Sequence, residues 1–303
     1  MANRSHLVER AVEAMGSPIH APAAPPPAAP ATDHPIAGRF SRPPDPQRPT
    51  AVPSSPPVIP MALLRDAGLA FASNASTRTR LIEELALVQH QLLRGIAPAA
   101  GEVRALPRHR LIMVTSARRG EGKSFTSLNL AASIASTASQ PVLLIDVDGG
   151  ASSLSAQLGM LTEPGLLSLA AAPDRPTDAL PRPTAIERLS FLPHGRILEN
   201  PTRAPIPSAM AAAIRALSAT LPHHVLIIDT PPALSTSDAQ ALAAVAGQVI
   251  VVVRAESTQR DEVEAALDLV EACPALHLLL NRTRLATNDS FGAHGEYGAT
   301  KHE

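Results

Sequence analysis

Residues 111–124 constrain the fold of this 303-residue chain more than any other segment. They read LIMVTSARRGEGKS, an apolar strand that runs into a glycine-rich turn and ends in Lys-Ser. Gly120 and Gly122 allow the backbone to curl close to an anion and to direct several N–H groups inward. Lys123 supplies a positive charge for the β- and γ-phosphate oxygens, and Ser124 supplies a hydroxyl for Mg²⁺. The segment therefore predicts a phosphate-binding loop for a nucleoside triphosphate.

The residues after this loop support the prediction. FTSLNLAASIA is typical of a helix, and its N-terminus would present positive dipole ends to the phosphates. One position departs from the strict pattern G-x-x-x-x-G-K-[ST], because Ala117 stands where the first glycine is usual. The alternative is a chance loop, and the strand-loop-helix order argues against it. The predicted nucleotide contacts in this segment are Arg119, Gly120, Glu121, Gly122, Lys123, Ser124 and Phe125.

Two further apolar segments end in acidic residues. VLLIDVD ends in Asp146 and Asp148, and HVLIID ends in Asp229 at the Walker B position. Buried parallel strands deliver such carboxylates to the edge of the sheet where ligands bind. For each aspartate alone, the alternative is a cap of the following helix. We predict Lys123, Asp146, Asp148 and Asp229 as catalytic residues and Ser124, Asp146 and Asp229 as Mg²⁺ ligands, with the choice of base between Asp146 and Asp148 left open.

The combination of GEGKS, LLIDVD and IIDTPP resembles the bacterial tyrosine kinases of polysaccharide synthesis. These are relatives of the deviant Walker ATPases, which include partition and division-site ATPases. Within this group the chain is most similar to the exosortase-associated tyrosine autokinases, which work with a separate membrane chain-length protein. The resemblance covers nearly all of the chain outside its proline-rich stretch. It implies ATP and Mg²⁺ as cofactors, a membrane polysaccharide co-polymerase as partner, and a location on the cytoplasmic side of the inner membrane.

The resemblance also implies a phosphate acceptor and a base-binding position. The family phosphorylates tyrosines in its own C-terminal tail, and Tyr297 is the only tyrosine of this chain. Tyr297 would therefore be the sole tyrosine acceptor, unless it is an unused relic. By resemblance, Asn281 and Arg282 at the end of the last predicted strand would contact adenine. The alternative for this pair is a cap between strand and loop.

Two positions depart from the family pattern. The family carries an E-x-x-R-x-x-R arrangement that builds a ring of subunits, whereas Glu83 and Glu84 are followed by no arginine at those positions. The family also carries an arginine after the second acidic motif, where this chain has Gly149 and Gly150. Self-association is therefore left open. The rival interpretation is a nucleotide-switched regulatory ATPase or pseudokinase. A partition or positioning ATPase would need a basic patch or an amphipathic C-terminal helix, and the sequence has neither.

Strand and helix patterns alternate from Arg110 onward, which predicts an α/β fold with a doubly wound, mainly parallel sheet of the P-loop NTPase, MinD-like type. The segment before the domain is dense in proline and cannot pack a core. The amphipathic segment at the start is predicted to dock, although a frayed terminus is nearly as good an interpretation. We divide the chain into a docking helix (1–17), a Pro/Ala-rich linker (18–60), a helical lead-in (61–108), the kinase or ATPase domain (109–285) and a Gly-rich tail (286–303).

Composition excludes several other classes of protein. Aromatic residues make up 2% of the chain, so a core must consist of Ala, Leu, Val and Ile. The single cysteine, Cys273, excludes an intrachain disulfide framework and favours a reducing compartment. A net charge of -1 gives no general attraction to nucleic acid. The longest apolar stretch, residues 241–253, is too short to cross a bilayer, and the start of the chain does not look like a secretory signal. These features predict a cytoplasmic protein.

Overall fold

The computed structural model describes residues 57–71, 80–96, 107–172, 180–196 and 206–283. The chain divides into two units, Met1–Val52 and Pro53–Glu303, and every described residue belongs to the second. The predicted docking helix (1–17) and the tail with Tyr297 lie outside the described residues. The description below therefore concerns the second unit alone.

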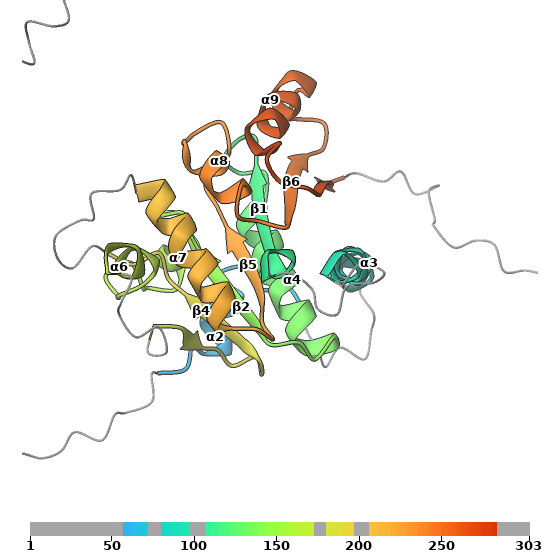
Figure 1. The fold of residues 1–303 in the computed structure, drawn as a ribbon. Helices are drawn as coiled ribbons and strands as arrows, with labels where there is room; N and C mark the ends of the chain where they lie inside the picture. Colours follow the sequence, from blue (N-terminus) through green and yellow to red (C-terminus); the bar gives the residue numbers. More distant parts are fainter. Residues whose placement is uncertain (1–56, 72–79, 97–106, 173–179, 197–205, 284–303) are drawn as a thin grey trace, which may run out of the picture. The chain divides into compact units, whose positions relative to one another are not determined.

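A seven-stranded sheet forms the centre of this unit, in the order β3-β4-β2-β5-β1-β6-β7 (Figure 1). Its strands pair in parallel, except that β3 is antiparallel to β4. The predicted doubly wound, mainly parallel sheet is thus confirmed. The strands are β1 (Leu111–Ser116), β2 (Val142–Asp146), β3 (Arg182–Pro183), β4 (Leu189–Leu192), β5 (Val225–Asp229), β6 (Gln248–Arg254) and β7 (Leu276–Asn281).

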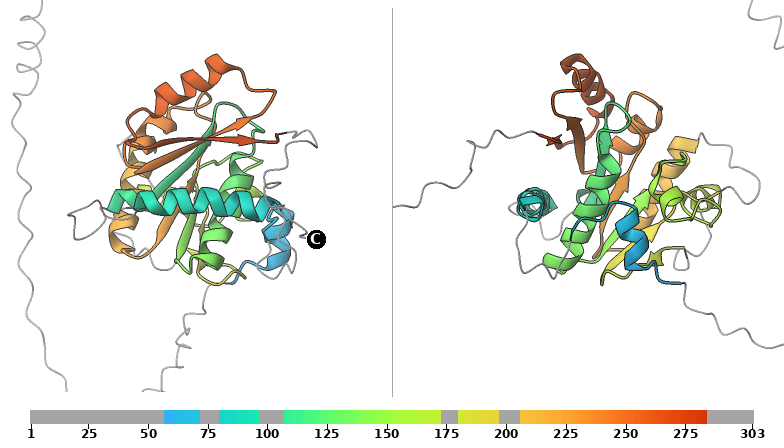
Figure 2. Two further views of the ribbon diagram at one scale, coloured as in Figure 1. Left: turned by 90° about the vertical axis from the view of Figure 1, so that its right-hand side faces the viewer. Right: turned by 180° about the vertical axis from the view of Figure 1, so that it is seen from behind.

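Helices cover both faces of the sheet (Figure 2). One face carries α3 and α4, and the other carries α7, α8 and α9. The described helices are α2 (Met61–Asp66), α3 (Arg80–Ile96), the 3-10 turn η1 (Pro107–Arg110), α4 (Lys123–Thr137), α5 (Leu154–Gln157), α6 (Leu166–Ala171), α7 (Ile206–Thr220), α8 (Asp238–Ala243) and α9 (Arg260–Val270).

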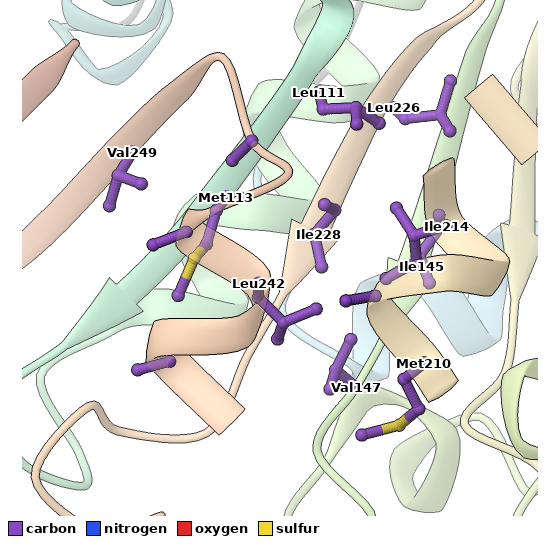
Figure 3. Close-up of a cluster of buried hydrophobic side chains, with 14 of the residues drawn as sticks. Leu111, Met113, Ile145, Val147, Met210, Ile214, Leu226, Ile228, Leu242 and Val249 are labelled. Atoms are coloured by element: carbon purple, nitrogen blue, oxygen red, sulfur yellow. The ribbon is translucent and has the colours of Figure 1, made fainter. Parts of the chain in front are cut away.

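The central strands are continuous apolar runs because both of their faces are buried. Successive side chains point to opposite faces, so Leu111 and Met113 enter one hydrophobic cluster while Ile112 and Val114 enter the other. Figure 3 shows the first cluster, in which Leu242 of α8 and residues of α7 pack over the sheet. The two clusters hold the central strands in place, and the carboxyl ends of these strands meet at one edge.

Residues 57–71, here called the strap, belong to the folded unit. The N–H of Ile59 donates to the Pro183 carbonyl at 2.8 Å, and the Ile59 carbonyl accepts from the Ala185 N–H at 2.9 Å. The Ile59 side chain is buried, with 1% of its surface exposed. The sequence assigned residues 57–60 to the linker, and this boundary is wrong. The reason is that Ile59 extends the edge of the sheet through a bridge to Thr184, a pairing that leaves no local sequence pattern.

The strap is joined to α4 through the fully buried side chain of Asn129. Its Oδ1 accepts from the N–H groups of Ala70 and Phe71, both at 2.8 Å. Its Nδ2 donates to the carbonyls of Gly68 at 3.0 Å and Phe125 at 2.9 Å. Four hydrogen bonds thus use the amide completely. The strap is thereby fixed to the first turns of the helix that begins at Lys123.

Replacing Asn129 by alanine is expected to lower the free energy of unfolding by about 2–4 kcal/mol, because it leaves buried backbone groups of the strap unpaired. Denaturant unfolding followed by circular dichroism measures this change. Gln157→Ala is the control, since Gln157 is an exposed amide with a hydrogen bond to the Ser152 carbonyl. Equal stability of the two variants would contradict the role assigned to Asn129.

Candidate nucleotide-binding site

The loop between β1 and α4 has the backbone conformation that its glycines predict. Gly120 and Gly122 have φ angles of 80° and 102°, in the left-handed region that favours glycine. A Cβ atom on Gly122 would lie 2.1 Å from Asn281 Nδ2, whereas one on Gly120 would have nothing within 4 Å. Gly122 is therefore required for both conformation and space. Gly120 faces open space, as expected of a loop that holds a ligand.

Glu121 and Asn281, two of the residues predicted to contact the nucleotide, stabilise this loop by hydrogen bonds. Glu121 is buried, and its carboxylate accepts from the Arg118 N–H at 2.9 Å and from the Thr258 hydroxyl. Asn281 Nδ2 donates to the Glu121 carbonyl at 2.8 Å. Thr258 precedes α9 and Asn281 ends β7, so segments distant in the sequence hold the loop. The structure thus gives Glu121 and Asn281 a supporting role within the loop.

The remaining predicted contacts lie around the loop. Arg119 and Arg282 are exposed, and Phe125 is exposed over 36% of its surface. Phe125 lies beside the strap, since a Cβ atom on Gly68 would be 3.6 Å from its ring. These side chains are accessible to a ligand that enters from solvent.

Lys123 is almost completely buried and faces an acidic partner. Only 9% of its surface is exposed, and its Nζ lies 3.5 Å from Asp148 Oδ2. The other oxygen of Asp148 accepts from the Gly150 N–H at 2.9 Å. An incoming phosphate would therefore compete with Asp148 for Lys123. The structure brings together Lys123 and the acidic motif that follows β2.

Asp146 and Asp229 are register partners on β2 and β5, and both are fully buried. Asp146 accepts from the N–H groups of Asp148 at 2.9 Å and Ser155 at 2.6 Å. Asp229 Oδ1 accepts from the Ser127 hydroxyl at 3.1 Å. Among the described residues, Asp229 Oδ2 has no hydrogen-bond partner. An unpaired buried carboxylate oxygen is costly unless a ligand satisfies it.

Burial is the main reason why the pKa values of both carboxyl groups are raised. Burial raises the pKa of Asp146 to about 7, and the charge of Asp229 acts in the same direction. Burial also raises the pKa of Asp229 to about 6, although Lys123 and the hydroxyls of Ser124 and Ser127 oppose the shift. Two like charges in a buried position favour a cation between them.

The oxygen atoms present fit Mg²⁺. Asp229 Oδ2 is unpartnered, and the Ser124 hydroxyl lies near enough to Asp229 to lower its pKa. Mg²⁺ in nucleotide sites is usually held by one or two protein oxygens together with water and phosphate. No group of three His, Cys, Asp or Glu residues in the described ranges could hold a metal ion. Any Mg²⁺ bound here would therefore need oxygens from the nucleotide or from water.

Sequence reasoning missed three residues of this site. Ser127 lies one helical turn after Lys123, so helix periodicity could have placed it near the loop. Ser155 holds Asp146 through its backbone, and no sequence pattern marks such a contact. His194 follows β4 and faces the turn after β2, a position that depends on the strand order.

This strand, loop and helix, with paired aspartates on neighbouring strands, define a P-loop nucleotide-binding fold. Comparison with known proteins agrees, since the AAA domain family matches residues 109–277. The chain belongs to this AAA domain family, and its relatives there are named as bacterial tyrosine-protein kinases.

Three comparisons describe the similarity. The tyrosine-protein kinase YwqD of Bacillus subtilis is 30% identical over 61% of this chain and 77% of its own length. EpsB of Ralstonia nicotianae is 34% identical over 52% of this chain, which spans only 20% of EpsB. The kinase domain of the Escherichia coli tyrosine kinase ETK shares the fold, with a TM-score of 0.56 and 23% identity, over 73% of this chain and 81% of that domain. The chain thus spans about a fifth of the length of the EpsB relatives.

A search for membrane spans in the described part of the chain finds no helix with the length and apolar character needed to cross a bilayer.

Gly122→Ala is expected to weaken nucleotide binding by at least about tenfold, because the added Cβ meets Asn281 and the backbone would be strained. Gly120→Ala has the same strained φ but open space, so its loss should be smaller. Titration with a fluorescent ADP analogue gives both dissociation constants. An equal loss in the two variants would show that only the backbone conformation matters.

The carboxylate pair also predicts a pH dependence of stability. Because the pKa values in the folded chain, about 7 and about 6, exceed the ordinary pKa of an aspartate, the folded chain binds more protons than the unfolded chain between about pH 4 and 7. These groups therefore stabilise the fold most at acid pH, and this stabilisation is lost as the pH rises through the folded pKa values. Asp229→Asn should raise the free energy of unfolding at pH 8 by on the order of 2 kcal/mol and flatten the profile.

Chemical unfolding with a metal chelator, from pH 5 to pH 8, tests this dependence. Asp268→Asn serves as the control, since Asp268 is exposed on α9. A profile of the Asp229 variant that matches the unsubstituted chain would contradict the claim that the charged carboxylate of Asp229 destabilises the fold at high pH.

Proposed function

We propose that this chain is an ATP- and Mg²⁺-dependent protein-tyrosine autokinase that regulates exopolysaccharide polymerisation or export. The observation that carries the proposal is the acidic partner of the loop lysine. Asp148 lies 3.5 Å from Lys123 Nζ and has 16% of its side chain exposed, so it can meet both a phosphate ligand and an acceptor from solvent. The relatives named as tyrosine-protein kinases support the same reaction.

The phosphate loop and the side chains around it would bind the nucleotide. Lys123 and the loop amides would bind the phosphates, as in other P-loop proteins. Ser124 and Asp229, with Asp146 behind them, would hold Mg²⁺ directly or through water. When bound, Mg²⁺ neutralises charge on the phosphate oxygens. Arg119, Phe125 and Arg282 are the accessible side chains that would contact the rest of the nucleotide, beside the loop that Asn281 supports.

Phosphoryl transfer also needs an oriented acceptor hydroxyl. Asp146 and Asp148 were the two candidates for the base. Asp146 is fully buried and its oxygens already accept from two backbone N–H groups. Asp148 retains an exposed fraction, and it would be freed from Lys123 when the lysine turns to the phosphates. Asp148 is therefore the better placed residue to orient the hydroxyl and accept its proton.

Tyr297 is the proposed acceptor because the chain has no other tyrosine. The segment that carries it follows β7, and the last residue of β7 contacts the phosphate loop. The acceptor segment thus begins beside the site at which the phosphate would be bound.

The proposed setting comes from the family resemblance. A membrane polysaccharide co-polymerase on its cytoplasmic side would be the partner, and the chain would associate with the inner membrane through it. Self-association belongs to the same proposal, whereas nucleic acid does not. The divisions of the chain at residues 17, 108 and 285 also remain proposals, and the folded part begins with the strap at residue 57 in place of residue 61.

The second candidate is a regulatory ATPase or pseudokinase that switches partner binding with nucleotide state. The ion pair between Lys123 and Asp148 favours this candidate, because a nucleotide that binds Lys123 would break the pair. Nucleotide binding would then change the position of Asp148. A switch would need only this exchange and no tyrosine acceptor.

Incubation of the purified chain with ATP and Mg²⁺, followed by mass spectrometry, tests the kinase proposal. Phosphate is expected on Tyr297, with none in Lys123→Met or Tyr297→Phe. The cytoplasmic segment of the co-polymerase should be added in parallel. ATP hydrolysis without phosphate on Tyr297 in either condition would reject the autokinase and favour the switch.

A further inference from the structure

His194 is a partly buried imidazole beside the acidic motif, and the proposed reaction gives it no role. It follows β4, and its Nδ1 is buried without a hydrogen-bond partner among the described residues. Its backbone is fixed on both sides. The N–H donates to the Ser155 hydroxyl at 2.9 Å, and the carbonyl accepts from the Leu167 N–H at 2.9 Å. The imidazole therefore projects from a rigid support.

The imidazole lies directly against the turn that carries Asp148. A Cβ atom on Gly149 would be 2.7 Å from His194 Nε2 and 2.9 Å from its Cδ2. Gly149 is not among the residues with positive φ, so its conformation does not require glycine. The space favours glycine, because the His194 imidazole would have to shift to admit a Cβ atom at position 149. The two residues therefore depend on one another.

The same histidine is linked to the other aspartate of the motif. Ser155 accepts from the His194 N–H and donates its own N–H to Asp146 Oδ2 at 2.6 Å. Asp146 Oδ1 in turn accepts from the Asp148 N–H at 2.9 Å. The backbone of His194 is thus linked to Asp146 through Ser155, and its imidazole contacts the other end of the segment at Gly149.

Burial of the imidazole favours its neutral form. Burial lowers the pKa of His194, while the Val147 carbonyl and the carboxylates of Asp148 and Asp238 act in the opposite direction. A neutral imidazole fills space without competing with Lys123 for the charge of Asp148. Its contribution in this state is contact with the turn.

We propose that His194 is a positioning residue that fixes the Asp148–Gly150 turn, so that the Asp148 carboxylate stays aligned when Lys123 leaves it for the nucleotide. Lys123 is the only cation that forms an ion pair with Asp148 in the described ranges. Once this pair opens, the turn keeps only its backbone hydrogen bonds and the contact with His194. This inference rests on the proposed function, which assigns Asp148 to the acceptor hydroxyl or water.

Steady-state ATP hydrolysis by the full chain tests the proposal in two backgrounds. His194→Ala should lower kcat about tenfold with little change in KM for ATP, since a displaced carboxylate affects alignment more than binding. His194→Gln should keep most of the activity, because its amide can reach the position of Nε2. With Asp148→Asn already present, His194→Ala should have no further effect, as expected for residues that act as a unit.

The contact with Gly149 gives an independent cycle. Gly149→Ala should reduce kcat strongly through its clash with His194, and adding His194→Ala should restore kcat to the level of His194→Ala alone. Thermal melting of every variant controls for folding. If His194→Ala is too unstable to assay alone, the single variant His194→Gln is compared with the double variant that carries both Gly149→Ala and His194→Ala. This comparison provides the same test.

An equal loss of kcat from His194→Ala in both Asp148 backgrounds would overturn the positioning role, as would an unchanged kcat. Hydrolysis that depends on His194 without phosphate on Tyr297 would overturn the autokinase proposal and keep the positioning role. Phosphate that accumulates on Tyr297 at the same rate in His194→Ala as in the unsubstituted chain would overturn the positioning role and keep the autokinase proposal. An unsubstituted chain that does not turn over ATP would overturn both.

Discussion

The burial of two neighbouring carboxyl groups is the constraint on which the ligand edge of this sheet depends. The parallel register of β2 and β5 places Asp146 beside Asp229, and both are withdrawn from water. Backbone N–H groups, the Ser127 hydroxyl and the Lys123 ammonium compensate part of this charge. The remainder is left to a ligand. The same residues that destabilise the edge would favour a bound cation, and binding of one would return the lost stability by mass action.

The central strands and the loop could be predicted from sequence for a physical reason. An apolar run that ends in aspartate has few ways to bury itself, and a parallel sheet is the one that leaves the carboxylate at an edge. The strap could not be predicted, because its hydrogen bonds to Asn129 join residues that lie more than fifty positions apart in the sequence. No periodicity encodes a bond between such distant residues. Glu121 and Asn281 illustrate an intermediate case. The sequence predicts both as nucleotide contacts, whereas their contact with one another follows from the position of β7 at the edge of the sheet, which no local pattern encodes.

The match to the AAA domain family covers residues 109–277 and leaves the strap and α3 outside it. Both of these segments nevertheless contact α4, the helix that begins at the phosphate loop. The strap does so through Asn129, and α3 through Gln89, which accepts from the Ser133 hydroxyl at 2.7 Å. Segments added to the family core thus converge on the one helix whose position sets the loop. A change in either segment would reach the nucleotide site through a single rigid element.

The contact of β7 with the phosphate loop limits how far the segment that follows it can extend from the site. Asn281 touches the loop, and the covalent chain from there to Tyr297 can span at most about 55 Å. If Tyr297 is the acceptor, as proposed above, it would meet the site of its own chain at an effective concentration that dilution does not change. Transfer within one molecule would then proceed at a rate independent of protein concentration, whereas transfer between molecules would slow in proportion to dilution. Because β7 ends beside the phosphate loop, transfer within a single molecule is sterically possible.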